Sequence, residues 1–159
     1  KRGIFLKTYN KDFFTSQNID FSPEEQYITI SKKNVLRGMH FQDNEDAHKK
    51  LVTCIKGSVL DVVVDLRKDS PNFNKPFSLE LNNNNSLAIL IDKGFAHGFL
   101  ALKDESLMLY MTSTGYSPKN DKGILWKSIN YSWPINDPII SERDRSHPSF
   151  QLDNNLFKL

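Results

Sequence analysis

The sequence has little of what defines several common classes of protein. Cys54 is its one cysteine among 159 residues, so the chain can form no internal disulfide and does not require an oxidising compartment. No apolar run approaches the roughly 18 residues of a membrane-spanning helix, and the first residues do not resemble a secretion signal. We therefore expect a cytoplasmic protein with no membrane partner. The sequence starts at Lys1 without an initiator methionine, which leaves open a short missing N-terminal segment.

An excess of one charge is also absent. Lys and Arg number 21 against 19 Asp and Glu, giving a formal net charge of +2, whereas nucleic-acid-binding domains are usually strongly basic. We therefore expect no nucleic-acid partner. Hydrophobic residues make up 38% and charged residues 25%, which is typical of a folded protein. The length predicts a single domain over residues 1–159.

Several familiar motifs of metal and phosphate chemistry are missing. Histidine occurs at positions 40, 48, 97 and 147, and no two have the spacing of His-x-His or His-x-x-x-His. A structural zinc site is therefore nearly excluded, and a catalytic metal could be assembled only from residues far apart in the sequence. Neither a Gly-x-Ser-x-Gly nucleophile motif nor a glycine-rich phosphate loop is present.

The apolar residues that are present occur in short runs, without a long helical stripe. We expect strands at 26–30, 51–55, 59–66, 77–81, 87–91 and 106–111. Residues 56–58, with Gly57 at the centre, predict a hairpin between the second and third of these runs. One short helix is expected within 8–18. Many short strands at this spacing predict an all-β sandwich or barrel.

Candidate functional residues lie at the ends of these strands. Arg37 and His40 are three apart and would face opposite ways on a regular strand, but Gly38 allows a bulge that turns both toward one cavity. The alternative for His40 is an ordinary half-buried strand residue. His97 is followed closely by Gly98, which indicates a close approach of the backbone or, alternatively, a tight loop.

Three further features have ordinary structural alternatives. Tyr110 and Tyr116 flank the end of a strand and could be common sheet aromatics. Lys50 could be a gatekeeper residue, that is, a charge at the end of a hydrophobic strand that opposes aggregation. The charged run 141–145, taken alone, is typical of a solvated surface.

Taken together and in order, these segments resemble the dTDP-4-dehydrorhamnose 3,5-epimerase family. The similarity extends from Arg2 to Asp144, and its individual motifs are weak but their order is specific. The matching segments are Arg2-Gly3-Ile4-Phe5, 35–42, 50–52, 61–67, 70–73, 94–99, Tyr110, 116–118, 133–134 and 138–144.

The resemblance implies a fold, a partner and a reaction. It implies a cupin-type jelly-roll β-barrel with a few short helices, acting as a homodimer without metal or other cofactor. The substrate would be a nucleotide-diphospho-sugar with a ketone at C4. Epimerisation at C3 and/or C5 would remove a proton beside the ketone and return one from the opposite face, as in deoxysugar (rhamnose-type) biosynthesis.

The resemblance also implies roles for residues. His40 would be the base, oriented by Asp144. Tyr110 would be the acid on the far face, and Lys50 would stabilise the enolate oxygen. The substrate-binding residues would be Arg2, Phe5, Arg37, His97 and Tyr116. Arg2 is expected to serve the site of the neighbouring subunit.

Some positions depart from the family pattern and keep alternatives open. Residues 25–31 replace a usually more polar stretch, Met111 stands where a lysine often follows the first tyrosine, and 126–128 lack an acidic pair. The alternatives are a mono-epimerase, a 3,4-ketoisomerase on another nucleotide-sugar, or a non-catalytic sugar-binding cupin. Metal-dependent cupins are disfavoured by the absent His-x-His.

Overall fold

The structure is a computed structural model that describes residues 2–152, in which strands predominate. The helical elements are α1 (Lys11–Ser16), η1 (Asn44–Asp46), η2 (Trp126–Ser128) and α2 (Glu142–Arg145). The strands are β1 (Glu25–Ser31), β2 (Leu36–Gln42), β3 (Lys50–Lys56), β4 (Ser58–Asp65), β5 (Pro76–Asn82), β6 (Ala88–Ile91), β7 (Phe95–Ala101), β8 (Ser106–Thr112) and β9 (Asp121–Gly123).

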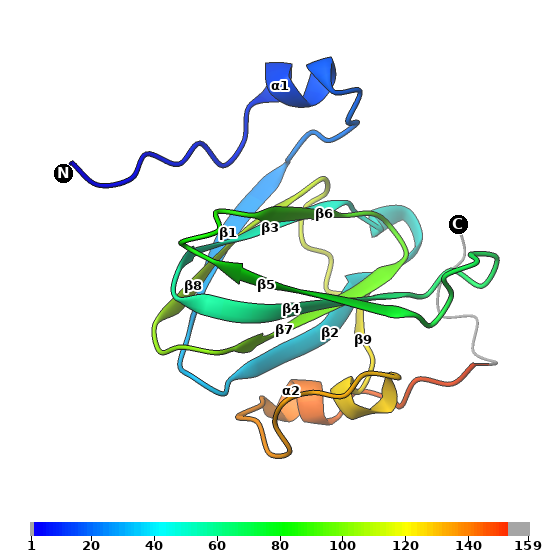
Figure 1. The fold of residues 1–159 in the computed structure, drawn as a ribbon. Coiled ribbons are helices and arrows are strands. Elements are labelled where there is room, and N and C mark those ends of the chain that lie inside the picture. Colours follow the sequence, from blue (N-terminus) through cyan, green and yellow to red (C-terminus); the bar gives the residue numbers. More distant parts are fainter. Residues whose placement is uncertain (1, 153–159) are drawn as a thin grey trace.

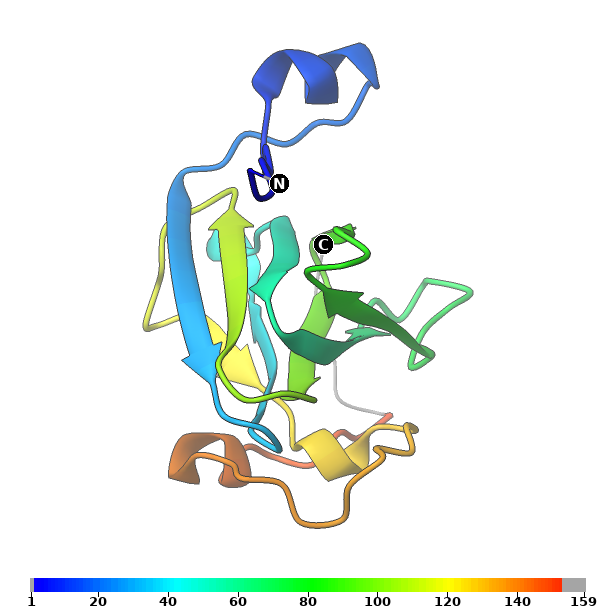
Figure 2. The same cartoon turned by 60° about the vertical axis from the view of Figure 1, so that its left-hand side comes forward.

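The strands form two antiparallel sheets that pack against each other (Figure 1 and Figure 2). The smaller sheet has the order β1-β8-β3-β6, and the larger has the order β5-β4-β7-β2-β9. One core cluster joins them, with Val52 and Met108 from the smaller sheet and Val63 and Phe99 from the larger. Burial of each such side chain contributes about 1.5–3 kcal/mol, so this cluster holds the two sheets in a fixed relation.

The outer face of the larger sheet is covered by the C-terminal segment. Met39 and Val64 project from the sheet into a second cluster with Ile124 and Ile129, and Trp133 packs against it. Figure 1 shows α2 and the segment around it lying beneath β2 and β9. α2 itself contacts β2, where its Asp144 meets His40.

The outer face of the smaller sheet is partly covered by the N-terminal segment. Phe21 is buried with Leu51 and Leu109, and Phe14 of α1 packs against them. Asn10 caps α1, since its side chain accepts a hydrogen bond from the backbone N–H of Phe13. Residues 2–10, which precede α1, run clear of the two sheets as an extended arm (Figure 1).

Most of the elements expected from the sequence are confirmed, but the hairpin is wrong. The helix expected within 8–18 is α1, and the expected runs correspond to β1, β3, β4, β5, β6 and β8. However, β3 pairs with β6 and β8, whereas β4 pairs with β5 and β7 in the other sheet. The chain around Gly57 therefore crosses between sheets. The physical reason is that both runs are almost continuously buried, so each forms a central strand with two other partners.

In two other segments the structure differs from the alternative that the sequence left open, namely a tight loop at 95–99 and a solvated surface at 141–145. Residues 95–99 are the start of β7, a central strand, and do not form a tight loop. The charged run 141–145 is not wholly solvated, because Asp144 of α2 is buried. Neither helix of the described chain, α1 or α2, has the length and apolar character that a bilayer crossing requires.

Candidate active site

A cleft of about 420 Å³ opens between the two sheets, and both sheets contribute to its walls. The smaller sheet supplies Glu25, Tyr27, Thr29, Lys50, Tyr110 and Thr112. The larger sheet supplies Arg37, His40, Phe41, Gln42, His97, Gly98, Phe99 and Asp121. Loops and α2 complete the lining with His48, Tyr116, Ser141, Arg143 and Asp144. A bound molecule would therefore be enclosed by polar side chains from opposite directions.

An irregularity in β2 turns Arg37 and His40 into this cleft. The register between β2 and β7 shifts between these two residues, and both line the cleft. Gly38 has φ +128°, and a Cβ there would lie 2.5 Å from the Cα of Gly98. The sequence predicted a bulge at Gly38 and a close approach of the backbone at Gly98. Both have one structural cause, because the backbone at Gly38 packs directly against the backbone at Gly98.

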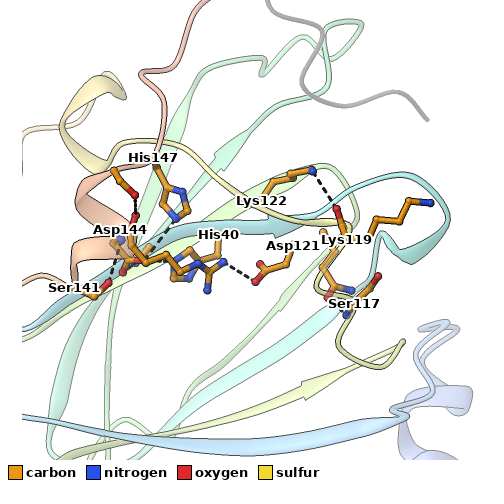
Figure 3. Close-up of polar contacts among 12 residues, drawn as sticks. His40, Ser117, Lys119, Asp121, Lys122, Ser141, Asp144 and His147 are labelled. Carbon is orange, nitrogen blue, oxygen red and sulfur yellow. Dashed lines mark hydrogen bonds and ion pairs between the residues drawn. The ribbon is translucent and has the colours of Figure 1, made fainter.

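His40 and Asp144 form a hydrogen-bonded pair at one wall (Figure 3). His40 Nε2 lies 2.7 Å from Asp144 Oδ1, and the backbone N–H of Gly38 donates to Asp144 Oδ2 at 3.2 Å. Ser141 caps α2 by accepting from the backbone N–H of Asp144, which fixes the carboxylate's position. The other ring nitrogen of His40, Nδ1, does not contact this carboxylate.

The environment of Asp144 favours its ionised form. Burial raises the pKa of this carboxyl, but the hydrogen bond and charge of His40 and the Gly38 N–H outweigh it, so the pKa lies below its ordinary value. The carboxylate can therefore hold Nε2–H of His40 and stabilise the imidazolium that forms when Nδ1 takes up a proton.

Tyr110 lies in the wall formed by the smaller sheet. Its ring stacks on Tyr27 with centroids 4.7 Å apart and planes 11° apart, and its hydroxyl lies 3.3 Å from Thr29 Oγ1. The side chain is buried, and this burial raises the pKa of the phenol. Tyr110 therefore stays protonated over the physiological pH range and can act only as a proton donor to a strongly basic partner.

Lys50 projects into the cleft from the start of β3, also in the smaller sheet. It is buried, and burial lowers its pKa to about 8, against the opposing effect of Asp121 and Asp61. An ammonium held in a dry wall is a strong local charge, because surrounding water does not screen it. Lys50 is therefore a buried residue of the cleft and not a solvent-exposed gatekeeper charge at the end of a strand.

A second buried His–Asp pair supports the floor of the cleft. His97 Nε2 lies 2.8 Å from Asp61 Oδ2, and both side chains are almost inaccessible to water. Asp61 lies on β4, next to β7 in the larger sheet, so the pair is formed across neighbouring strands. The contact fixes the His97 ring where it lines the cleft.

Most of the residues predicted from the sequence are brought together here. The lining includes His40, Asp144, Tyr110, Lys50, Arg37, His97 and Tyr116. Arg2 and Phe5 are on the N-terminal arm, outside the lining of the cleft, and Phe5 is 87% exposed. Their binding role stays a prediction.

Other residues of the site were missed from the sequence. Tyr27 and Thr29 alternate along β1, which gives a strand signal but no functional signal. Asp121 and Arg143 form an ion pair of 2.6 Å at the cleft, although they are 22 positions apart. His147 packs edge-on against His40, with ring centroids 5.5 Å apart. Among the described residues, one group could hold a metal ion, namely His40, Asp144 and His147.

Comparison with known proteins assigns the family. A family model described as dTDP-4-dehydrorhamnose 3,5-epimerase matches residues 1–152. The chain belongs to the dTDP-4-dehydrorhamnose 3,5-epimerase family. It is 39% identical over 155 residues to the dTDP-4-dehydrorhamnose 3,5-epimerase of Shigella flexneri, covering 94% of this chain and 84% of that one. Membership makes this protein an isomerase of the epimerase class.

Solved structures of the epimerase family have the same fold. The crystal structure of the Bacillus anthracis epimerase with TDP and PPi bound superposes with a TM-score of 0.90 at 37% identity, covering 94% of this chain and 87% of that one. The Legionella pneumophila epimerase in complex with dTDP-4-keto-L-rhamnose gives a TM-score of 0.87 at 28% identity, covering 95% and 88%. The expected all-β jelly-roll (cupin) fold with a few short helices is confirmed.

Proposed function

We propose that this protein epimerises a nucleotide-linked 4-keto-6-deoxy sugar at the carbons beside its C4 ketone. The observation that carries the proposal is the placement of His40 on one sheet and Tyr110 on the other, with the cleft between them. Inversion needs a proton to leave one face of a carbon and another to arrive at the opposite face. Two proton-transfer groups on opposed walls meet that requirement.

The first step removes a proton from C3 or C5. The C4 ketone acidifies these hydrogens, and Nδ1 of His40 takes the proton while Nε2–H stays bonded to Asp144. The imidazolium that results is stabilised by the adjacent carboxylate. Electrons of the broken C–H bond move toward the ketone oxygen and form an enolate.

Lys50 is proposed to stabilise the enolate oxygen. Its ammonium lies in the same wall as Tyr110, and its burial keeps water from screening the charge. Because the charge is placed before the reaction begins, it favours the enolate over the neutral ketone. That difference lowers the barrier to proton removal.

The second step returns a proton from the other side. Tyr110 donates its phenolic proton to the enolate carbon, and the inverted ketone and a tyrosinate result. Burial disfavours the tyrosinate, so the phenol gives up its proton only to a base as strong as the enolate. Solvent then restores the proton on Tyr110 and removes one from His40.

The remaining lining residues suit a nucleotide-diphospho-sugar. Arg37 reaches the cleft with a guanidinium whose planar donors match phosphate oxygens, and His97 is held rigidly by Asp61. Tyr116 is 62% exposed at the mouth, where its ring can cover the sugar. The TDP of the Bacillus anthracis structure and the dTDP-4-keto-L-rhamnose of the Legionella pneumophila structure support this substrate class.

We further propose that two copies of the chain form a homodimer through the N-terminal arm and β1. Ile4 and Phe5 of the arm are 78% and 87% exposed, and β1 is an edge strand whose Ile28 and Ile30 are more than half exposed. Apolar residues on an edge strand and an extended arm are a combination that a second copy would cover. Arg2 would then reach the partner's cleft. The cytoplasmic location stays a prediction.

Proton NMR in deuterium oxide with dTDP-4-keto-6-deoxyglucose tests the proposal. Loss of the C3 and C5 proton signals, with formation of the inverted sugar, is the expected result. Exchange at one carbon alone would indicate a mono-epimerase or ketoisomerase. Absence of exchange, with the nucleotide-sugar still bound, would leave a binding protein and contradict the proposal.

A further inference from the structure

His147 lies beside both His40 and Asp144 and adds a third atom that could bind a metal ion (Figure 3). Its Nε2 lies 3.6 Å from Asp144 Oδ1, and its ring meets the His40 ring at 77°. This Nε2 is buried and makes no hydrogen bond within the described chain. The three ligand atoms all lie within 4.8 Å of one another.

The position of His147 depends on a glycine in the neighbouring strand. A Cβ at Gly123 of β9 would collide with the His147 ring at Nε2 and the two adjacent carbons. Because Gly123 has no side chain, the ring can lie against β9 with its free nitrogen directed toward Asp144. The unpartnered nitrogen is therefore held in place by packing, not left to rotate in solvent.

The three donors match the ligand preference of Zn²⁺ and similar ions. Imidazole nitrogens and a carboxylate oxygen bind zinc at about 2.0–2.2 Å, which places ligand atoms about 3.4 Å apart in a tetrahedral site. The Asp144 Oδ1 oxygen is 2.7 Å from His40 Nε2 and 3.6 Å from His147 Nε2, so small side-chain shifts suffice. Arg143, the nearby cation, is engaged by Asp121 at 2.6 Å.

We propose that His40, Asp144 and His147 form a binding site for a divalent transition-metal ion of the Zn²⁺ type, and that the bound ion switches the epimerase off. The second half of this proposal rests on the proposed function. His40 can bind the ion through Nε2 only if the proton on that nitrogen moves to Nδ1. Nδ1 is the atom that would accept the substrate proton, so metal binding removes the base without removing the residue.

Metal binding is measured directly, without the reaction. The full chain is titrated with Co²⁺, whose visible absorption reports tetrahedral coordination, and Zn²⁺ is then added as a competitor. His147→Phe keeps a ring at this position but removes the ligand, and we expect at least about a tenfold loss of Co²⁺ affinity. His48→Phe is the matched control, because His48 lies outside the cluster, and it should bind Co²⁺ like the parent.

Thermal melts of each variant separate loss of a ligand from loss of the fold. If His147→Phe does not fold, His147→Gln replaces it. Equal Co²⁺ affinity in the parent and in the folded position-147 variant would overturn the site. So would an equal loss in His48→Phe, because the ion would then bind elsewhere.

Inhibition is measured by solvent deuterium exchange into the keto-sugar. We expect micromolar Zn²⁺ to stop exchange in the parent, a chelator to restore it, and His147→Phe to resist the metal relative to its own metal-free rate. Equal inhibition of both proteins would contradict the switch. A parent with no exchange in metal-free buffer would refute the proposed function instead, while the Co²⁺ titration would still decide the site.

Discussion

His40 and Tyr110 line one cleft from different sheets of the sandwich, and each is held by a contact within its own wall. Asp144 holds the imidazole through a 2.7 Å hydrogen bond, and Tyr27 stacks on the phenol at 4.7 Å. The two sheets are joined by a packed core, so the distance between the proposed acid and the proposed base is set by the fold. The reaction proposed above depends on this separation.

Replacing His40 with Asn should abolish turnover while nucleotide-sugar binding persists. The amide cannot take up a proton at neutral pH, and general-base catalysis is worth about 10²–10⁴-fold. Steady-state kinetics together with calorimetric titration of the nucleoside diphosphate measure the two effects. Asp144→Asn should reduce turnover too, because it removes the acceptor that orients the ring. Turnover near the parent rate in His40→Asn would remove His40 as the base.

Lys50 should impose an alkaline limit on activity. Its pKa of about 8 means that the ammonium is lost as pH rises through this value, and enolate stabilisation is lost with it. The rate should therefore fall above about pH 8. Lys50→Arg, which stays charged in this range, should move the limit to higher pH in a pH–rate profile. An identical profile in both proteins would assign the limit to another group.

The same lysine should cost the protein stability at neutral pH. Its folded-state pKa is depressed from 10.5 to about 8, so folding disfavours the charged form and stability rises with pH between these two values. Lys50→Met removes the buried charge and should raise the melting temperature at pH 7 while losing activity. Calorimetry at pH 7 and pH 10 checks this, and the gain should be smaller at pH 10.

Gly38 should be intolerant of a side chain. Its φ is +128°, and a Cβ would lie 2.5 Å from the Gly98 backbone. Gly38→Ala should therefore lower the free energy of unfolding by about 1–3 kcal/mol and displace His40. Gly115→Ala is the matched control, because a Cβ there has nothing within 4 Å. Denaturant unfolding of both variants measures the difference. A Gly38→Ala protein as stable as Gly115→Ala would contradict the packing described here.

The N-terminal arm should matter for both assembly and affinity. Removing residues 1–6 deletes Arg2 and the exposed Ile4 and Phe5, so we expect a weaker dimer and a higher KM for the nucleotide-sugar. Light scattering coupled to gel filtration gives the mass, and kinetics give the KM. Arg2→Ala in the full-length chain separates the two roles, since it should raise KM without changing the mass. A monomeric parent protein would refute the dimer.

The sequence predicted strands and several site residues, but not how the strands pair. Alternation and β-branched runs identified β1, β3 and β4, because burial imposes those patterns locally. The β3–β4 hairpin was wrong, since a turn residue such as Gly57 does not determine whether the chain stays in one sheet or crosses to the other.

Residues far apart in the sequence were harder to assign. Asp144 was placed in the site by family resemblance, whereas the charge pattern around it predicted a solvated surface. His147 carried no signal, and the family resemblance of 61–67 assigned Asp61 no role. The contacts of these two residues with His40 and His97 exist only in the folded chain. Arg2 and Phe5 lie on the N-terminal arm, outside the lining of the cleft, so nothing in the cleft of this chain contacts them.

The most direct test of the opposed acid and base is the Tyr110→Phe variant in deuterium oxide. Without the phenol, the enolate can be reprotonated only from the His40 side, so deuterium should enter beside the ketone without inversion of configuration. Proton NMR follows exchange and product stereochemistry in the same sample, with Tyr27→Phe as a control that keeps the stacked rings and the Tyr110 hydroxyl. Inversion by Tyr110→Phe at the parent rate would contradict the account, because Tyr110 would then not supply the proton.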